Sequence, residues 1–181
     1  MANIVVVQIE GIKPLLQHRY YSADEPEPKT NIRTGRPAYE LEAEKAAYRD
    51  ADGKLCQPGD HIHASMVKAA ANFKIPGKRG KSYKDLIQTS VDVCPDLIPH
   101  IFQEYEIDSR GVVVQRSRII RYRPRLNKWA LKFELHIIDE QLDVSVVRQI
   151  LDYAGRCVGI GDYRPKFGRF VVTEWKEVGQ G

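Results

Sequence analysis

The chain has 181 residues, of which 43% are hydrophobic, enough for the core of one folded domain and too many for wholesale disorder. It has no apolar run of about 18 residues and no signal-peptide pattern at its N-terminus, which predicts a cytoplasmic protein without membrane association. The formal net charge is only +4, but residues 61–138 carry fourteen lysines and arginines against seven aspartates and glutamates. This central excess is typical of a protein with a phosphate-backbone partner, and a solvated charged surface is the alternative.

The first half of the chain alternates between regular elements and irregular, charged stretches. A β-branched run at residues 4–9 predicts a buried strand, and residues 13–19 predict a turn or short helix. Residues 22–54 change composition and predict a mobile, partly helical insertion. A helix is expected over residues 60–73 with Asp60 as its N-cap, followed by a basic loop at 76–81 and a second helix at 83–90.

In the second half, strands dominate. Pro95 and Pro99 bound a stretch expected to be irregular, and strands are expected at residues 101–107 and 112–122. A turn at 124–128 leads into residues 129–138, where apolar and polar side chains alternate cleanly. A helix capped by Asp143 or Ser145 and ended by Gly155 precedes a last strand at 170–175.

Reduced to its core, this order is β-α-β-β-α-β, which predicts an α+β fold of the ferredoxin-like type. The helices are expected on one face of the sheet, with the long insertion after the first strand. The whole chain, residues 1–181, is therefore interpreted as a single domain.

Five arginines lie between residues 116 and 125 without an intervening acid. They are expected to form a basic hairpin that binds a polyanion, because protecting an exposed strand edge needs only one or two charges. Tyr122 and Trp129 lie among them and are candidates for stacking on bases, although core positions are the alternative. The arginines are Arg116, Arg118, Arg121, Arg123 and Arg125.

Residues 158–170 form a glycine-rich loop between a helix and a strand. Glycines let backbone amides approach a phosphate closely, and neighbouring cations add attraction; a tight turn requiring positive φ is the alternative. Gly168 is expected to be purely structural. The loop follows a helix, which is the reverse of the dinucleotide-binding arrangement. Its binding candidates are Gly159, Gly161, Tyr163, Arg164, Lys166 and Arg169.

A third basic group lies earlier in the chain. Lys68 stands on the expected helix at 60–73, and Lys78, Arg79 and Lys81 lie in the loop after it. Lys68 and this loop are expected to flank one groove, with a solvated surface as the alternative for each.

The loop at residues 159–170 resembles the C-terminal glycine-rich loop of the repeat-associated (RAMP) superfamily, which is found in CRISPR RNA-guided effector complexes. Residues 58–70 are similar to a helix of the backbone subunits in that family, and residues 6–16 to their first strand and turn. The resemblance implies an RRM-like domain acting in antiviral defence, with RNA held along the sheet and the glycine loop. It also implies binding to copies of itself or to other effector subunits.

Three functions remain open from the residues. The first is sequence-tolerant binding of single-stranded RNA or single-stranded DNA. The second, which the resemblance implies, is a metal-independent endoribonuclease using His18 as general acid or base. The third is a phage-encoded relative that acts as a protein-interaction subunit or binds single-stranded DNA.

Other catalytic and metal-dependent classes find no support in the motifs. There is no P-loop, no Gly-x-Ser-x-Gly elbow and no Cys/His dyad. His61 and His63 are two residues apart at a helix start, an unfavourable spacing for a shared metal. Cys56, Cys94 and Cys157 are widely spaced, which predicts reduced thiols. No cofactor, no metal and, outside the nuclease alternative, no catalytic residue is expected.

Overall fold

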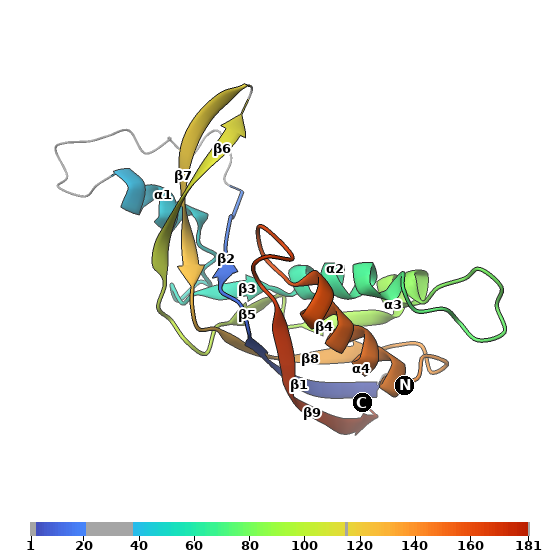
Figure 1. Ribbon diagram of the computed structural model, residues 1–181. Helices are drawn as coiled ribbons and strands as arrows, with labels where there is room; N and C mark the ends of the chain where they lie inside the picture. Colours follow the sequence, from blue (N-terminus) through green and yellow to red (C-terminus); the bar gives the residue numbers. More distant parts are fainter. Residues whose placement is uncertain (1–2, 21–37, 115, 181) are drawn as a thin grey trace.

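The computed structural model describes residues 3–20, 38–114 and 116–180 (Figure 1). The prediction of a mobile segment therefore lies, for residues 22–37, outside the described residues. The described helices are α1 (Ala38–Ala46), α2 (Gly59–Ala70), α3 (Lys84–Ser90) and α4 (Val144–Tyr153), with a π-helical turn η1 (Ala154–Val158). The described strands are β1 (Asn3–Gly11), β2 (Leu15–Leu16), β3 (Cys56–Pro58), β4 (Val91–Cys94), β5 (Leu97–Pro99), β6 (Glu106–Val114), β7 (Ser117–Leu126), β8 (Ala130–Ile137) and β9 (Phe170–Gln180).

Four strands form the central antiparallel sheet, in the order β4-β8-β1-β9. Together with α2 and α4 they run through the chain as β1-α2-β4-β8-α4-β9. That chain order and that strand order define the ferredoxin-like topology, so the predicted fold class is confirmed.

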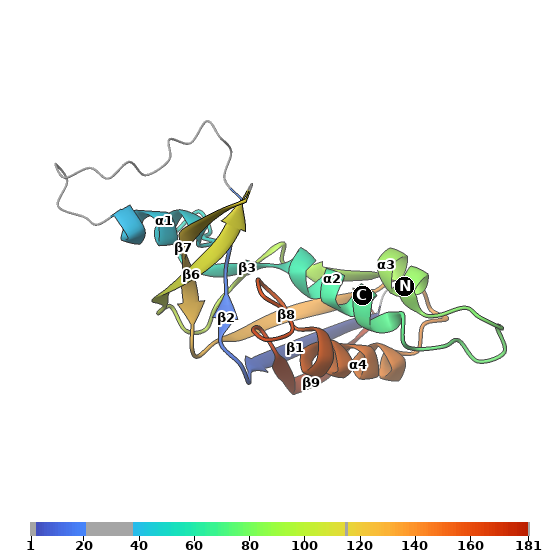
Figure 2. The same cartoon turned by 45° about the horizontal axis from the view of Figure 1, so that its top comes forward.

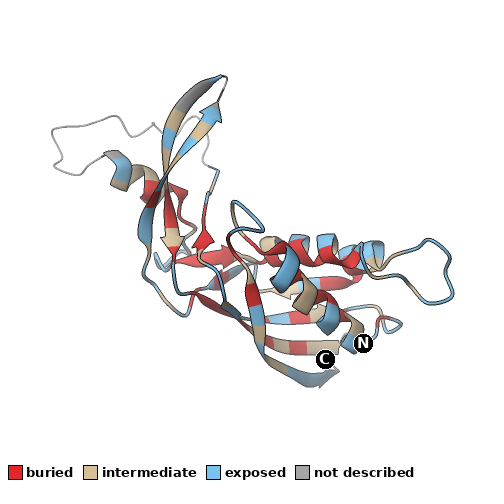
Figure 3. Ribbon diagram, in the orientation of Figure 1, coloured by how far each residue is buried: buried red, intermediate tan, exposed pale blue. Residues whose placement is uncertain are grey.

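The sheet's inner face is the core of the domain. Val5, Val7 and Ile9 of β1 alternate with half-exposed residues, and Leu131 and Leu135 of β8 do the same. Because successive side chains of a strand point to opposite faces, this alternation buries one face and leaves the other to solvent. Helices α2 and α4 cover the inner face with Ile62, Met66, Ile150 and Leu151 (Figures 2 and 3).

Helix α4 begins as the sequence indicates. The carboxylate of Asp143 accepts a hydrogen bond from the Ser145 amide at 2.7 Å, which satisfies one of the free N–H groups of the first turn. Its end differs from the prediction. Gly155 does not terminate the helix but lies inside η1, where a Cβ atom would overlap the backbone of Phe170. The glycine is needed for close packing of η1 on β9.

Several other boundaries also differ. Asp60 is not the N-cap of α2, because Pro58 occupies that position and Asp60 lies in the first turn. Residues 15–16 form the short strand β2 and not a helix, since they pair with the end of β7. Residues between Pro95 and Pro99 include β5, which pairs with β3, and β9 runs past residue 175 to Gln180.

The basic hairpin is the largest departure from the sequence prediction. Residues 101–105 are not a strand, and the chain reverses between Val114 and Ser117, in the middle of the strand expected at 112–122. The turn at 124–128 does not connect a hairpin either, because β7 pairs with β6 and β2 whereas β8 pairs with β1 and β4. Strands β6 and β7 therefore form an arm that projects from the body, with α1 packed against it (Figure 1). None of the described helices is long and apolar enough to cross a membrane.

A buried polar cluster joins the segment after β2 to the start of α2. Gln17 donates from Nε2 to the Cys56 carbonyl at 2.8 Å, and its Oε1 accepts from the Tyr48 amide at 3.1 Å. The same Nε2 lies 3.3 Å from Nε2 of His100. Because an amide nitrogen is a donor, this contact requires an unprotonated Nε2 and hence a neutral imidazole. Burial lowers the pKa of His100 to about 4.

The neutral state of His100 predicts acid sensitivity. The unfolded chain takes up this proton below its ordinary pKa of 6.5, whereas the folded chain resists until about pH 4. Stability from this group is therefore complete above pH 6.5 and is lost as the pH falls towards 4, by up to about 3 kcal/mol. Urea unfolding at several pH values should give a steeper acid loss for the wild type than for His100→Gln. Equal slopes would contradict the assignment.

Candidate nucleic-acid interface

The glycine-rich loop, residues 159–169, packs across the start of the β2 segment. Gly159, Gly161 and Gly168 all have positive φ, as the tight-turn alternative requires. At Gly168 a Cβ would overlap the carbonyl oxygen of Ile160, and at Gly161 it would collide with Leu15 and Leu16. The loop's shape is thus fixed by close backbone approach to its own fold.

Most of the loop's amides already have protein acceptors. Gly159 N–H donates to the Ala154 carbonyl, Asp162 N–H to Leu16 and Gly168 N–H to Pro14, at 2.8, 2.9 and 2.8 Å respectively. The amide of Tyr163 donates to the Asp162 carboxylate at 3.0 Å. A phosphate cradle built from the Gly159 amide is therefore not available, and the loop presents its side chains instead.

Asp162 joins the loop to the base of the hairpin. Its Oδ2 lies 2.8 Å from Nη1 of Arg123, which is only 5% exposed on β7, and 3.7 Å from Nδ1 of His18. The arginine contact is an ion pair without the alignment of a good hydrogen bond. Arg123 is consequently committed to the fold and does not extend into solvent.

Two guanidinium groups lie close to the Tyr163 ring. The Cζ atoms of Arg110 and Arg123 are 5.4 and 5.3 Å from its ring centroid, within the range of cation–π attraction. Arg110 also lies 4.6 Å from the Phe167 ring and makes a two-point ion pair with buried Asp108, at 2.6 and 3.0 Å. Tyr163 has φ of 54° and is 40% exposed, so part of its ring faces solvent beside the hairpin.

The remaining hairpin residues differ in whether their side chains have protein partners and in how exposed they are. Arg121 pairs with Glu42 of α1 at 3.3 Å, and Tyr122 packs on Tyr39 with 5.5 Å between ring centroids. Arg116 is exposed in the turn at the hairpin tip, with φ of 71°. Arg125 is half-buried near the end of β7, and the side chain of Arg118 lies outside the described residues.

The glycine loop adds two exposed cations to this region. Arg164 and Lys166 are exposed beside Tyr163, whereas Arg169 is half-buried where the loop enters β9. We call Arg110, Arg121, Arg123, Asp162, Tyr163, Arg164 and Lys166 the hairpin–loop interface. Trp129 is not part of it, because it is buried, donates to the Lys13 carbonyl at 2.9 Å and packs on Phe170.

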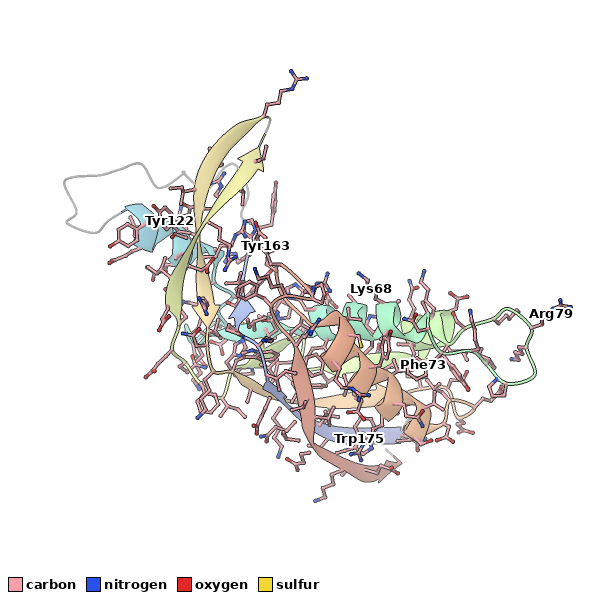
Figure 4. The ribbon with its side chains drawn as sticks, viewed as in Figure 1. Lys68, Phe73, Arg79, Tyr122, Tyr163 and Trp175 are labelled. Atoms are coloured by element: carbon pink, nitrogen blue, oxygen red, sulfur yellow. The ribbon has the colours of Figure 1, made fainter. Side chains whose placement is uncertain are left out.

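The third basic group lies elsewhere. Figure 4 shows Tyr163 beside the hairpin, Lys68 on α2, and Arg79 at the far end of the molecule beyond α2 and α3. Lys68, Lys78, Arg79 and Lys81 are all exposed. The 78–81 loop lies away from the hairpin, because the length of α2 separates them.

The open face of the sheet differs from an RRM platform. Its outward side chains on β1, β4 and β8 include no phenylalanine, tyrosine or tryptophan within the described residues. The face carries mixed charges, such as Lys132 paired with Glu174 at 2.8 Å and Glu134 paired with His136 at 2.9 Å. Since base stacking on a sheet needs exposed rings, the expected RNA path along the sheet is not supported.

His18 is exposed at the end of the β2 segment, beside Asp162. Burial and the nearby charge of Arg123 lower its pKa from 6.5, and Asp162 opposes the shift. Sequence reasoning passed over Arg110 and Asp162, because their contacts with Tyr163 and Arg123 respectively join segments distant along the chain. It also missed Asp108, although its partner Arg110 lies only two residues further along β6. Among the described residues, no group of three or more potential metal ligands is found.

Fold and site define a ferredoxin-like α+β domain with a projecting basic hairpin that meets a glycine-rich loop. No family model and no curated protein sequence matches the chain. Among solved structures, the crystal structure of Cmr6 from Pyrococcus furiosus aligns with a TM-score of 0.47 and 13% identity, covering 94% of this chain and 98% of that one. This likeness assigns no function to any residue of the chain.

Proposed function

We propose that the chain binds single-stranded nucleic acid, preferably RNA, at the hairpin–loop interface without sequence specificity. The observation that carries the proposal is Tyr163, an exposed ring beside two guanidinium groups, with the exposed cations Arg164 and Lys166 next to it. A ring supplies stacking to any base, and cations follow the backbone, which is the usual pairing in sequence-tolerant single-strand binding.

The loop sequence at 159–170 extends this proposal to a biological setting. Its resemblance to the RAMP glycine-rich loop suggests a subunit of an RNA-guided effector complex, with guide RNA and other effector subunits as partners. The exposed Lys68 and the 78–81 loop lie away from the interface and are available for a longer strand or for a neighbouring subunit.

A titration of labelled single strands tests the binding proposal. Fluorescence anisotropy of a 20-nucleotide RNA, the matching DNA and the RNA duplex should rank single-stranded RNA first. Its Kd should rise steeply between 50 and 200 mM salt, because phosphate contacts release counterions. Binding that is absent or insensitive to salt would overturn the proposal.

The same mixtures separate binding from cleavage. His18 lies 3.7 Å from Asp162 and has a lowered pKa, the features that a general base requires. We expect the RNA to be recovered intact after long incubation. A product formed without metal by the wild type and absent with His18→Ala would move the assignment to an endoribonuclease.

A further inference from the structure

A separate cavity opens at the base of the hairpin, beside Arg125 near the end of β7. Its volume is about 510 Å³, within the range of small-ligand sites. It is lined by the segment after β5 (residues 101–105), by Glu106 at the start of β6 and by the turn between β7 and β8. Its walls include Phe102, Glu104, Tyr105, Arg125, Asn127 and Lys128.

The cavity combines aromatic and cationic groups in close contact. The Lys128 ammonium lies 4.2 Å from the centroid of the half-buried Phe102 ring, so a cation and a π-face point into the same space. Tyr105 contributes a second half-buried ring to the wall. Flat rings beside an exposed cation suit a ligand that has both an aromatic base and an anionic group.

Arg125 adds a second, incompletely paired cation. Its Nε is inaccessible to solvent yet has no hydrogen-bond partner within the described residues. A guanidinium group has five N–H donors, so an oxyanion in the cavity can pair with the Arg125 head group. Glu106 lies opposite Arg125 across the strand pair and, with Glu104, places carboxylates in the wall.

These groups match the parts of one ligand. A base fits against the two rings, the amide of Asn127 can pair with its edge, and a phosphate fits Lys128 and Arg125. The two carboxylates accept hydrogen bonds from ribose hydroxyls, as acidic residues do in nucleotide sites, and they disfavour a ligand that is only anionic. We propose that this cavity binds a ribonucleoside monophosphate, either as a free nucleotide or as the terminal nucleotide of a strand.

Isothermal titration with AMP, GMP, CMP and UMP, against the matching nucleosides and 2′-deoxynucleotides, tests the site. Lys128→Ala should weaken monophosphate binding about tenfold and leave nucleoside binding unchanged. Loss of the 2′-hydroxyl should weaken binding about threefold or more. Lys132→Ala removes an exposed lysine on β8 and serves as the matched control.

The ring contribution is tested with two substitutions, so that a folding defect is not mistaken for lost binding. Phe102→Ala and Phe102→Leu should both weaken nucleotide binding, with thermal midpoints measured in parallel. Absence of monophosphate binding at millimolar concentration, or binding unchanged by both Lys128→Ala and Phe102→Leu, would overturn the proposal.

Two further experiments identify the source of the nucleotide and test whether this site is separate from the hairpin–loop interface. If strand ends occupy the cavity, a linear RNA with a terminal phosphate should compete with AMP and a circular RNA of equal length should not. Competition by neither RNA assigns the cavity to free nucleotides. Tyr163→Ala should leave AMP binding unchanged, so mononucleotide binding without strand binding would refute the proposed function alone.

Discussion

Replacing Asp162 with alanine is expected to destabilise the fold by roughly 2–3 kcal/mol, because it leaves the buried Arg123 guanidinium without its counter-charge. Arg123 is 5% exposed and lies 2.8 Å from the carboxylate. A third of the Asp162 side chain is open to solvent, which keeps the expected loss at the lower end for a broken buried pair. Urea denaturation of the wild type and of Asp162→Ala at pH 7 measures this loss in the free energy of unfolding.

The double variant Arg123→Met/Asp162→Asn separates this pair from general damage to the loop. If the loss comes from the unpaired charge, the double variant should be more stable than Asp162→Ala, and the double-mutant cycle should give a coupling of about 1 kcal/mol or more. Asp92→Ala, at an exposed position on β4, should change stability by less than about 0.5 kcal/mol. Strictly additive losses would show that the pair does not join hairpin and loop.

The second large effect concerns strand binding at Tyr163. Tyr163→Ala should raise the Kd for single-stranded RNA about tenfold or more, since stacking on one base contributes about 1–3 kcal/mol. The slope of log Kd against log salt concentration should not change, because no cation is removed. Tyr163→Phe keeps the ring and should bind like the wild type.

The double variant Arg164→Ala/Lys166→Ala should have the complementary signature. Each lost phosphate contact lowers the magnitude of the salt slope by about 0.7 for single strands, giving a change of about 1.4 for two cations. Lys132→Ala/Lys176→Ala removes the same charge from the central sheet and should leave the slope as in the wild type. Equal effects of the two double variants would mean that net charge alone drives binding.

The sequence was informative where a pattern is local. Alternation in β1 and β8 and the helical period in α2 and α4 predict which side chains are buried, because each pattern reports one element's orientation towards the core. The six-element order followed from these patterns only in part, because the strands before β8 were expected at residues 101–107 and 112–122, whereas β4 (Val91–Cys94) takes that place in the sheet. The hairpin boundary did not, because the reversal between Val114 and Ser117 contains no glycine, proline, asparagine or aspartate to indicate a turn.

By itself, then, the sequence determined the fold class and the basic character of the hairpin, and it left a positive-φ turn as one of two alternatives for the glycine loop. Only the tertiary structure decided which cations are free. Arg123 is paired with Asp162 and Arg121 with Glu42, whereas Arg164 and Lys166 are exposed. The structure also decided that Trp129 lies in the core. The physical reason is that the partner of such a charged side chain comes from a segment distant along the chain. The residues around the side chain do not show which segment will lie next to it.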